Sequence, residues 1–196
     1  MIHLKPYKLF ESNNKFVIFD LIDNNDIDGI NNYIKNGGDI NVLDINMMTS
    51  PSGSSMKFYS QIPLIHAVIS DKIDIIRLLI KNGVDINKKN QETDTALNKA
   101  CEFDLFEITK LLLENGADIN TVNRFGETPL LWTLDSNNDD LLILLIKNNV
   151  DWESDEGFIY EIEKNNNKKL INIVKKYSKT KYENYLKNKK INDFNL

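Results

Sequence analysis

The sequence predicts an all-α solenoid of about five helix-turn-helix repeats joined by hairpin-like loops. Two short motifs recur with a common period of about 33 residues, and apolar residues at helical spacing run between them. With 41% hydrophobic and 27% charged residues, the composition is that of an ordinary globular protein. One helical pair of this size cannot bury its own apolar faces, so neighbouring pairs must stack.

The first motif has the form Gly-x-Asp-Ile-Asn. It occupies Gly83–Asn87, returns one period later as Gly116–Asn120, and appears in degraded form at Asn149–Glu153 after one more period. An upstream copy, Gly37–Asn41, lies more than one period before Gly83–Asn87, so the chain carries extra residues between these two copies. Glycine just past a helix suits a left-handed cap, and Asp and Asn favour a turn. The motif therefore predicts where each second helix ends.

The second motif opens the first helix of each repeat. Ile62–Leu64, Thr95–Leu97 and Thr128–Leu130 follow one another at the same period. Threonine caps a first turn, and proline at the first helical position sacrifices no hydrogen bond. A second helix follows each copy, with an apolar stripe that is clearest in Ile73–Ile80, Ile108–Leu113 and Leu141–Ile146.

Together the two motifs resemble the ankyrin repeat over residues 15–177. The best copy is Gly126–Leu130, preceded by Gly116–Asn120. The family's histidine after Thr-Pro-Leu is replaced by Ile65, Asn98 and Leu131, so we expect the usual side-chain bond there to be missing. The resemblance implies a helical solenoid that binds other proteins.

The predicted ankyrin-repeat domain spans residues 1–177. Its repeats are expected at about 12–43, 44–89, 90–122 and 123–153, with a capping repeat at 154–177. In the first repeat, Phe16, Val17 and Ile18 stand where Thr-Pro-Leu would be. The remaining segment, 178–196, is a basic C-terminal extension that we expect to be helical or mobile.

The extra residues between the first two repeats form an inserted loop at 47–59. It is rich in serine and carries Met47, Met48, Met56, Phe58 and Tyr59. Methionines and aromatics on a loop suit an adaptable apolar contact with a partner. The alternative is a tolerated surface insertion with no partner, and the sequence leaves both open.

The sequence lacks the residue constellations of common catalytic sites. It has one cysteine, Cys101, and two histidines, His3 and His66, too few for a zinc site of usual spacing. Gly-rich phosphate loops are also missing. We interpret Cys101 as a buried small residue and His66 as a packing or exposed polar residue. We therefore predict no catalytic, cofactor or metal site and no enzymatic activity, with an enzyme of unrecognised type as the alternative.

Charge is unevenly distributed along the chain. The net charge is −5, but residues 168–196 hold nine lysines against two carboxylates, so this segment carries +7 and the rest carries −12. An acidic body disfavours nucleic acid as a partner. No apolar run is long enough to span a bilayer. We expect a cytoplasmic monomer without nucleic-acid or membrane binding, with a role of the lysine-rich tail in either as the alternative.

The resemblance to ankyrin repeats also indicates where a partner would bind. Partners of that family commonly contact the concave face, the loop tips and the exposed ends of the first helices. By register, the candidate contacts are Lys89, Gln91, Glu92, Asp94, Glu102, Phe103, Arg124, Phe125, Glu127 and Asp135. Phe103 and Phe125 are the most informative, since aromatic anchors among charges are typical of interface hot spots. The alternative is that each folds back onto a neighbouring repeat.

We therefore predict a protein-binding module without a cofactor. Its carboxylates predict a partner surface that is basic and partly apolar. Such a module could inhibit its partner, as an immunity protein does. It could also recruit, as an adaptor or a secreted effector of an intracellular microbe does. The first role is slightly preferred by analogy with the family, and the residues do not decide between the two.

Overall fold

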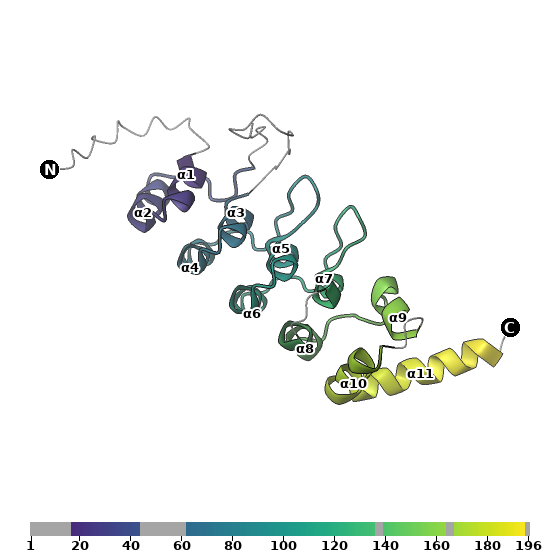
Figure 1. Cartoon of the computed structure of the whole chain (residues 1–196). Coiled ribbons are helices and arrows are strands. Elements are labelled where there is room, and N and C mark those ends of the chain that lie inside the picture. Colours follow the sequence, from purple (N-terminus) through teal and green to yellow (C-terminus); the bar gives the residue numbers. More distant parts are fainter. Residues whose placement is uncertain (1–16, 44–61, 136–138, 164–166, 195–196) are drawn as a thin grey trace, which may run out of the picture. The chain divides into compact units, whose positions relative to one another are not determined.

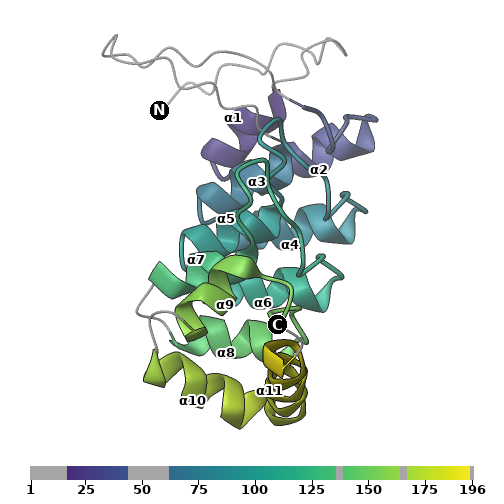
Figure 2. The ribbon, with the colours of Figure 1, turned by 90° about the vertical axis from the view of Figure 1, so that its right-hand side faces the viewer.

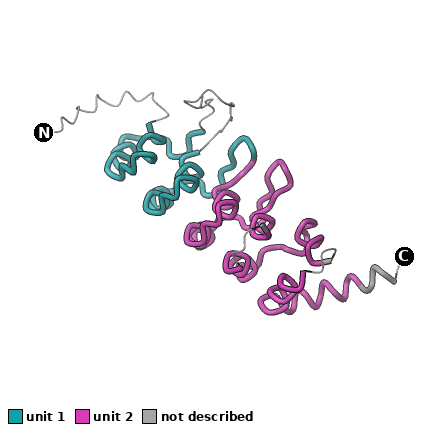
Figure 3. Tube along the Cα trace, in the orientation of Figure 1, with its two compact units in different colours: residues 1–92 teal, residues 93–196 magenta. Residues whose placement is uncertain are grey.

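The structure is a computed structural model that describes residues 17–43, 62–135, 139–163 and 167–194 (Figure 1). Every regular element in these residues is a helix. The chain divides into two compact units, Met1–Glu92 and Thr93–Leu196 (Figure 3). The inserted loop predicted at 47–59, and Phe16 in the first repeat, lie outside the described residues.

The first unit contains two helical pairs. The helices are α1 (Val17–Asp23), α2 (Ile27–Lys35), α3 (Pro63–Ile69) and α4 (Ile73–Lys81). Helix α1 packs on α2 and on α3, and α3 packs on α4. The core between them is made of fully buried aliphatic side chains, namely Ile18, Ile22, Ile30, Leu64, Ile65, Ile75, Ile76 and Leu79.

The second unit contains three pairs and a terminal helix. The helices are α5 (Ala96–Glu102), α6 (Phe106–Glu114), α7 (Pro129–Asp135), α8 (Asp139–Lys147), α9 (Glu156–Glu163), α10 (Lys168–Tyr177) and α11 (Lys179–Phe194). The first helices α5, α7 and α9 pack in one row, and the second helices α6, α8 and α10 pack in another. This two-row stacking is the predicted solenoid architecture. The helix pairs fall in phase with the predicted repeats, whose boundaries stay predictions.

The three first helices that follow a copy of the second motif, α3, α5 and α7, begin where that motif predicts. Pro63 and Pro129 occupy the first helical position of α3 and α7. The Thr95 hydroxyl accepts the backbone N–H of Asn98 in α5, and Thr128 accepts that of Leu131 in α7. These caps satisfy helix donors that would otherwise lack a partner.

The Gly-x-Asp-Ile-Asn motif ends each second helix with a left-handed residue. Gly37, Gly83 and Gly116 have φ values of 79°, 78° and 86°. The degraded copy places Asn149 in the same region, at 61°. A glycine adopts this backbone without the steric penalty of a side chain, which explains why the motif starts with glycine.

The asparagine of the same motif links one repeat to the next. In the three complete copies the aspartate accepts the backbone N–H of the asparagine, for example Asn120 N to Asp118 Oδ1 at 3.0 Å. The asparagine Oδ1 then accepts a backbone N–H of the following repeat. Asp85 N donates to Asn41 at 2.9 Å in the first unit, and Asp151 N donates to Asn120 at 2.8 Å in the second. The motif therefore sets both the turn and the step between repeats.

The basic C-terminal segment is helical. Figure 2 shows α11 nearly end-on beside α10, against which it packs. Its Tyr182 is buried, and the ring lies 6.4 Å from that of the fully buried Trp152. Lys181 donates to the carbonyl of Val150 and lies 3.5 Å from the Asp151 carboxylate. The extension therefore packs as an end cap on the last repeats.

Candidate protein-binding surface

Large apolar side chains of the second unit are exposed on its loop and its first helices. Phe103, the C-cap of α5, is 48% exposed. Phe125 and Val122, in the loop between α6 and α7, are 63% and 48% exposed, and Tyr160 on α9 is 55% exposed. Neither phenylalanine folds back into the core, which was the alternative to a surface position. Exposed aromatics of this size are common at interaction sites.

A hydrogen-bonded turn presents Phe125. The loop between α6 and α7 projects from the helices as a narrow hairpin (Figure 1). At its tip Asn123 Oδ1 accepts the backbone N–H groups of Phe125 and Glu127, at 2.9 and 3.0 Å. Gly126 takes a φ of 82°, and the Arg124 guanidinium lies 4.7 Å from the centre of the Phe125 ring. A side chain ordered before binding loses less entropy when a partner covers it.

Asp94 differs from the exposed position expected of a contact residue. Its side chain is buried, pairs with Lys99 Nζ at 2.8 Å and accepts the Asn123 amide at 2.9 Å. A buried carboxylate must be paired in this way, because leaving it unpaired would be costly. The side chain points inward and supports the loop, which weighs against a direct contact with a partner; its role in binding stays a prediction.

Lys99 and Asn123 connect this buried aspartate to two carboxylates nearer the solvent. Lys99 Nζ also contacts Glu102 at 2.8 Å, and the Asn123 amide donates to Glu127 at 2.8 Å. Burial alone would lower the pKa of Lys99, but hydrogen bonds and charge from Asp94 and Glu102 outweigh it and raise the pKa. Lys99 is therefore a permanent cation that fixes the positions of half-buried acidic groups.

The expectation that the helix-start bond is missing is wrong for the copy with Asn98. The Asn98 Oδ1 accepts the backbone N–H of Thr95 at 3.0 Å and the hydroxyls of Thr95 and Thr121 at 2.7 and 3.0 Å. Together with the Thr95 cap this makes a reciprocal capping box. The carboxamide oxygen of asparagine closes the network at the position where the family has histidine.

The other predicted contact residues vary in exposure. Lys89 and Gln91 are exposed and Glu92 is half-buried, in the last residues of the first unit. Arg124 is exposed in the second unit, where Glu102 and Glu127 are half-buried. Asp135 ends α7, and its side chain lies outside the described part of the structure. Their role in binding stays a prediction.

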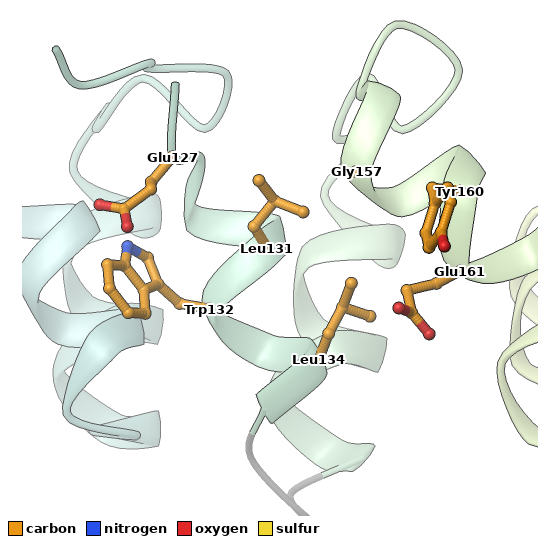
Figure 4. Close-up of a pocket in the computed structure, with 7 residues that line it drawn as sticks. All are labelled: Glu127, Leu131, Trp132, Leu134, Gly157, Tyr160 and Glu161. Carbon is orange, nitrogen blue, oxygen red and sulfur yellow. The ribbon is translucent and has the colours of Figure 1, made fainter. Parts of the chain in front are cut away.

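A hollow of about 340 Å³ lies between α7 and α9, and sequence reasoning did not identify it (Figure 4). Its lining includes Trp132 and Leu131 from α7, Tyr160 and Glu161 from α9, and Glu127 just before α7. The residues that line it come from two different repeats, so their proximity depends on how α7 and α9 pack, which no motif predicts.

Cys101 and His66 occupy structural positions in their units. The Cys101 thiol is fully buried, and burial raises its pKa to about 12, so it stays protonated at neutral pH. His66 is also buried, with Nε2 2.6 Å from the Asp23 carboxylate and its ring edge-on to Phe19. A protonated thiol is a poor nucleophile, so these surroundings disfavour nucleophilic chemistry at Cys101.

The described residues lack both a metal-binding cluster and a helix that could cross a membrane. These residues contain no cluster of three or more His, Cys, Asp or Glu side chains arranged to hold a metal ion. Within the same ranges, the helices lack the combination of length and apolar character needed to cross a bilayer. The absence of cofactors and of catalytic activity, and the cytoplasmic location, stay predictions.

Comparison with known proteins identifies the repeats. A solved ankyrin repeat domain, that of Bcl-3, described as a unique member of the IkappaB protein family, has a similar fold, with a TM-score of 0.55 and 22% sequence identity. The match covers 65% of this chain and 50% of that one, so the chain spans about half the length of that structure. At this identity the likeness shows the fold alone. Among curated proteins, none matches the sequence.

The family model for ankyrin repeats supplies the assignment. It matches residues 18–123 as three copies, which is more than half of the chain. Ankyrin repeats are generally protein–protein interaction modules, a role that agrees with the exposed aromatics and the ordered loop. On the match to three repeats and the two rows of stacked helices, the chain belongs to the ankyrin-repeat family.

Proposed function

We propose that this chain binds a partner protein through the loop tip and first-helix ends of its second unit. The observation that carries the proposal is Phe125, which is 63% exposed on a turn that Asn123 holds in place. Covering an exposed aromatic ring removes apolar surface from water, and a backbone that is already ordered loses little entropy when the ring is covered. Both properties are typical of the anchor residues of interfaces. Phe103 adds a second anchor at the end of α5.

The proposed partner surface is basic and partly apolar. Carboxylates at Glu102 and Glu127 accompany the exposed aromatics and are fixed by Lys99 and Asn123. Fixed charges steer a partner of opposite sign and disfavour partners of like sign. Residues 1–167 as a whole carry −12, which acts in the same direction.

Alanine substitution of the two anchors tests this surface. The full chain is immobilised and exposed to an extract of the source organism, from which it should retain a specific partner. The variants Phe125→Ala and Phe103→Ala should each retain about tenfold less of this partner. Leu186→Ala is the matched control, since it removes another exposed apolar side chain, on α11. Equal retention by all three variants would exclude the proposed surface, provided that their thermal unfolding stays unchanged.

We propose that binding acts by occlusion, as an inhibitor or immunity protein acts. Assaying the captured partner with and without a saturating amount of this chain separates this role from that of an adaptor or effector. An occluding chain lowers the partner's activity, whereas Phe125→Ala at the same concentration does not. Unchanged activity in the saturated complex would instead indicate recruitment.

A further inference from the structure

We propose that Asp94 is a positioning residue that couples Phe103 and Phe125, so that a partner meets the two anchors as one preformed surface. The inference rests on the proposed function, because it concerns how the same site is prepared for binding. Asp94 is buried and acts through its neighbours. The coupling is a property of the free chain, so it can be tested without the partner.

The two oxygens of the Asp94 carboxylate hold different elements. Oδ2 lies 2.8 Å from the Lys99 ammonium, on α5, and Oδ1 accepts the Asn123 amide at 2.9 Å, in the loop between α6 and α7. The Asp94 side chain is 2% exposed, so both contacts are shielded from water. Charged hydrogen bonds are stronger in such surroundings than at the surface. One buried carboxylate therefore ties the helix to the loop.

The contact with Lys99 leads to Phe103. Phe103 is the C-cap of α5, and its backbone N–H donates to the Lys99 carbonyl at 3.0 Å. The Lys99 ammonium also contacts Glu102, the residue just before this cap, at 2.8 Å. The residue that pairs with Asp94 is thus bonded to the turn that carries the first anchor.

The contact with Asn123 leads to Phe125. The Asn123 nitrogen donates to Asp94 and to Glu127, and its oxygen accepts the backbone N–H groups of Phe125 and Glu127. These bonds use all the donors and acceptors of the carboxamide. The side chain cannot rotate without breaking bonds on both sides. The turn that carries the second anchor therefore keeps a fixed position relative to Asp94.

A neutral side chain of the same size cannot serve both contacts. The amide in Asp94→Asn has one acceptor oxygen and one donor nitrogen, whereas the carboxylate has two acceptor oxygens. If the nitrogen faces Lys99, it meets a cation, and if it faces Asn123, two donors meet. Asp94→Asn therefore keeps the volume of the side chain and breaks the link between the anchors.

Hydrogen exchange of backbone amides in the full chain, measured by NMR, tests the coupling. Lys99→Met removes the ammonium, keeps the apolar stem and leaves the bonds within the Phe125 turn untouched. We expect the Phe125 amide to exchange about tenfold faster in this variant, since Asp94 loses the Lys99 cation and holds Asn123 less firmly. Asp94→Asn should accelerate exchange at both Phe103 and Phe125 by a similar factor.

Two controls separate a local effect from a general loss of stability. Lys110→Met removes an exposed lysine of α6 and should leave exchange at both anchors unchanged. The amide of Leu112, whose side chain is fully buried in α6, reports opening of the core in every variant. We expect this core amide to accelerate less than that of Phe125 in Lys99→Met.

The double variant that combines Asp94→Asn with Lys99→Met distinguishes positioning from packing. It removes the buried carboxylate together with the cation that balances it, and the new amide oxygen can still accept the Asn123 amide. The Phe125 amide should therefore exchange more slowly in the double variant than in Lys99→Met alone. A side chain that only fills space would give two losses that add.

The strain at Thr93 supplies a second background for the same comparison. Thr93 has a φ of 60°, a left-handed value at which the next copy of the loop has Gly126 at 82°. A β-branched residue is strained in this region, so Thr93→Gly should stabilise the turn. If Lys99→Met fails to fold, all variants are compared in the Thr93→Gly chain.

Several results would overturn the proposal. These are unchanged exchange at Phe125 in Lys99→Met, an effect of Asp94→Asn on one anchor alone, equal acceleration at Leu112, or additive losses in the double variant. A chain that fails here but loses its partner on Phe125→Ala would keep the proposed function with two independent anchors. A chain that shows the coupling but binds equally well without either phenylalanine would exclude the binding surface and leave Asp94 a structural link.

Discussion

The repeats matched by the family model and the C-terminal end of the chain are held together by different chemistry. Between residues 94 and 123, buried polar groups join loop to helix, with Asn98 as the acceptor for three donors. Between residues 150 and 194, contacts between aromatic rings hold the loop before α9 against α9 and α11. The ring centre of Trp152 lies 6.2 Å from that of Phe158, 6.4 Å from that of Tyr182 and 5.6 Å from that of Tyr185.

The difference follows from position in a stack. An internal repeat has a neighbour on each side, so its polar groups can be satisfied by the next copy of the same motif, as Asn120 is by Asp151. After the repeat that contains α9 and α10, the chain continues as the single helix α11, which packs on α10 in place of another helical pair. Here α11 provides the cover, with aromatic rings beneath and lysines toward the solvent.

Loss of Trp152 should have the largest effect. Trp152→Ala removes a fully buried indole from the centre of the ring cluster, and we expect it to lower the free energy of unfolding by about 3–5 kcal/mol. Urea unfolding followed by circular dichroism measures the loss. Hydrogen exchange should show α10 and α11 opening first, because a stack can fray from its end.

Trp132→Ala is the control for that experiment. Trp132 is half-buried beside the hollow, so its truncation should cost clearly less than that of Trp152. If the two variants lose equal stability, or if Trp152→Ala leaves protection of α11 unchanged, aromatic packing is not what holds the end cap.

Loss of Asn98 should have the next largest effect. Asn98→Ala leaves the buried hydroxyls of Thr95 and Thr121 and a backbone N–H without their acceptor, at a cost of about 2–3 kcal/mol. Asn98→His offers a ring nitrogen as acceptor and should recover more than half of that loss. Urea midpoints of the two variants make the comparison. A histidine variant no more stable than the alanine variant would show that the amide geometry is specifically required.

The sequence was sufficient for the repeated parts of the fold because period, caps and turns are local. Gly83 and Gly116 take left-handed φ values of 78° and 86°, and Thr95 caps its helix, as their motifs predict. The inward direction of the Asp94 side chain could not be predicted, because its partner, Asn123, is 29 residues away. A register gives the position of a residue along the repeat and leaves open which side chain a loop turns inward.

The candidate site was predictable only in part, for the same reason. Exposure of Phe103 and Phe125 agrees with their register. The hollow depends on Gly157, whose missing side chain lets α9 approach Leu131, and no motif marks that contact. Nor did the nine lysines of residues 168–196 indicate that Tyr182, in the same segment, would be buried. The lysine content indicates the exposed face of α11, whereas the buried face is set by a few apolar residues that composition does not reveal.

Lys181 joins the end cap to the acidic end of the fourth repeat, and its removal should have a smaller effect. Its ammonium donates to the carbonyl of Val150 and lies 3.5 Å from Asp151 and 3.6 Å from Glu153. Lys181→Met keeps the apolar stem and should cost about 0.5–1 kcal/mol in urea unfolding. Lys187→Met, on the exposed part of α11, is the control and should cost nothing measurable.

This contact also affects how a role for the lysine-rich tail is tested. Deleting residues 179–196 would remove Tyr182 and uncover Trp152, so lost binding could reflect lost stability. Replacing only Lys187 and Lys189 by glutamine leaves the ring cluster intact. Salt-dependent binding of nucleic acid or anionic vesicles that survives in the full chain and disappears in this variant would support the tail alternative.

The titration of Asp151 should show the smallest effect. A hydrogen bond with Ser154, followed by the charge of Lys181, holds the pKa of this carboxyl below its ordinary value. Because the folded pKa is lowered, the carboxylate stabilises the fold above the ordinary pKa of about 4, and this contribution is lost as the pH falls through the folded value. Carbon-detected NMR titration should show that Ser154→Ala raises the pKa more than Lys181→Met does. The opposite order would mean that the ion pair from α11, and not the local turn, dominates the charge at the start of the end cap.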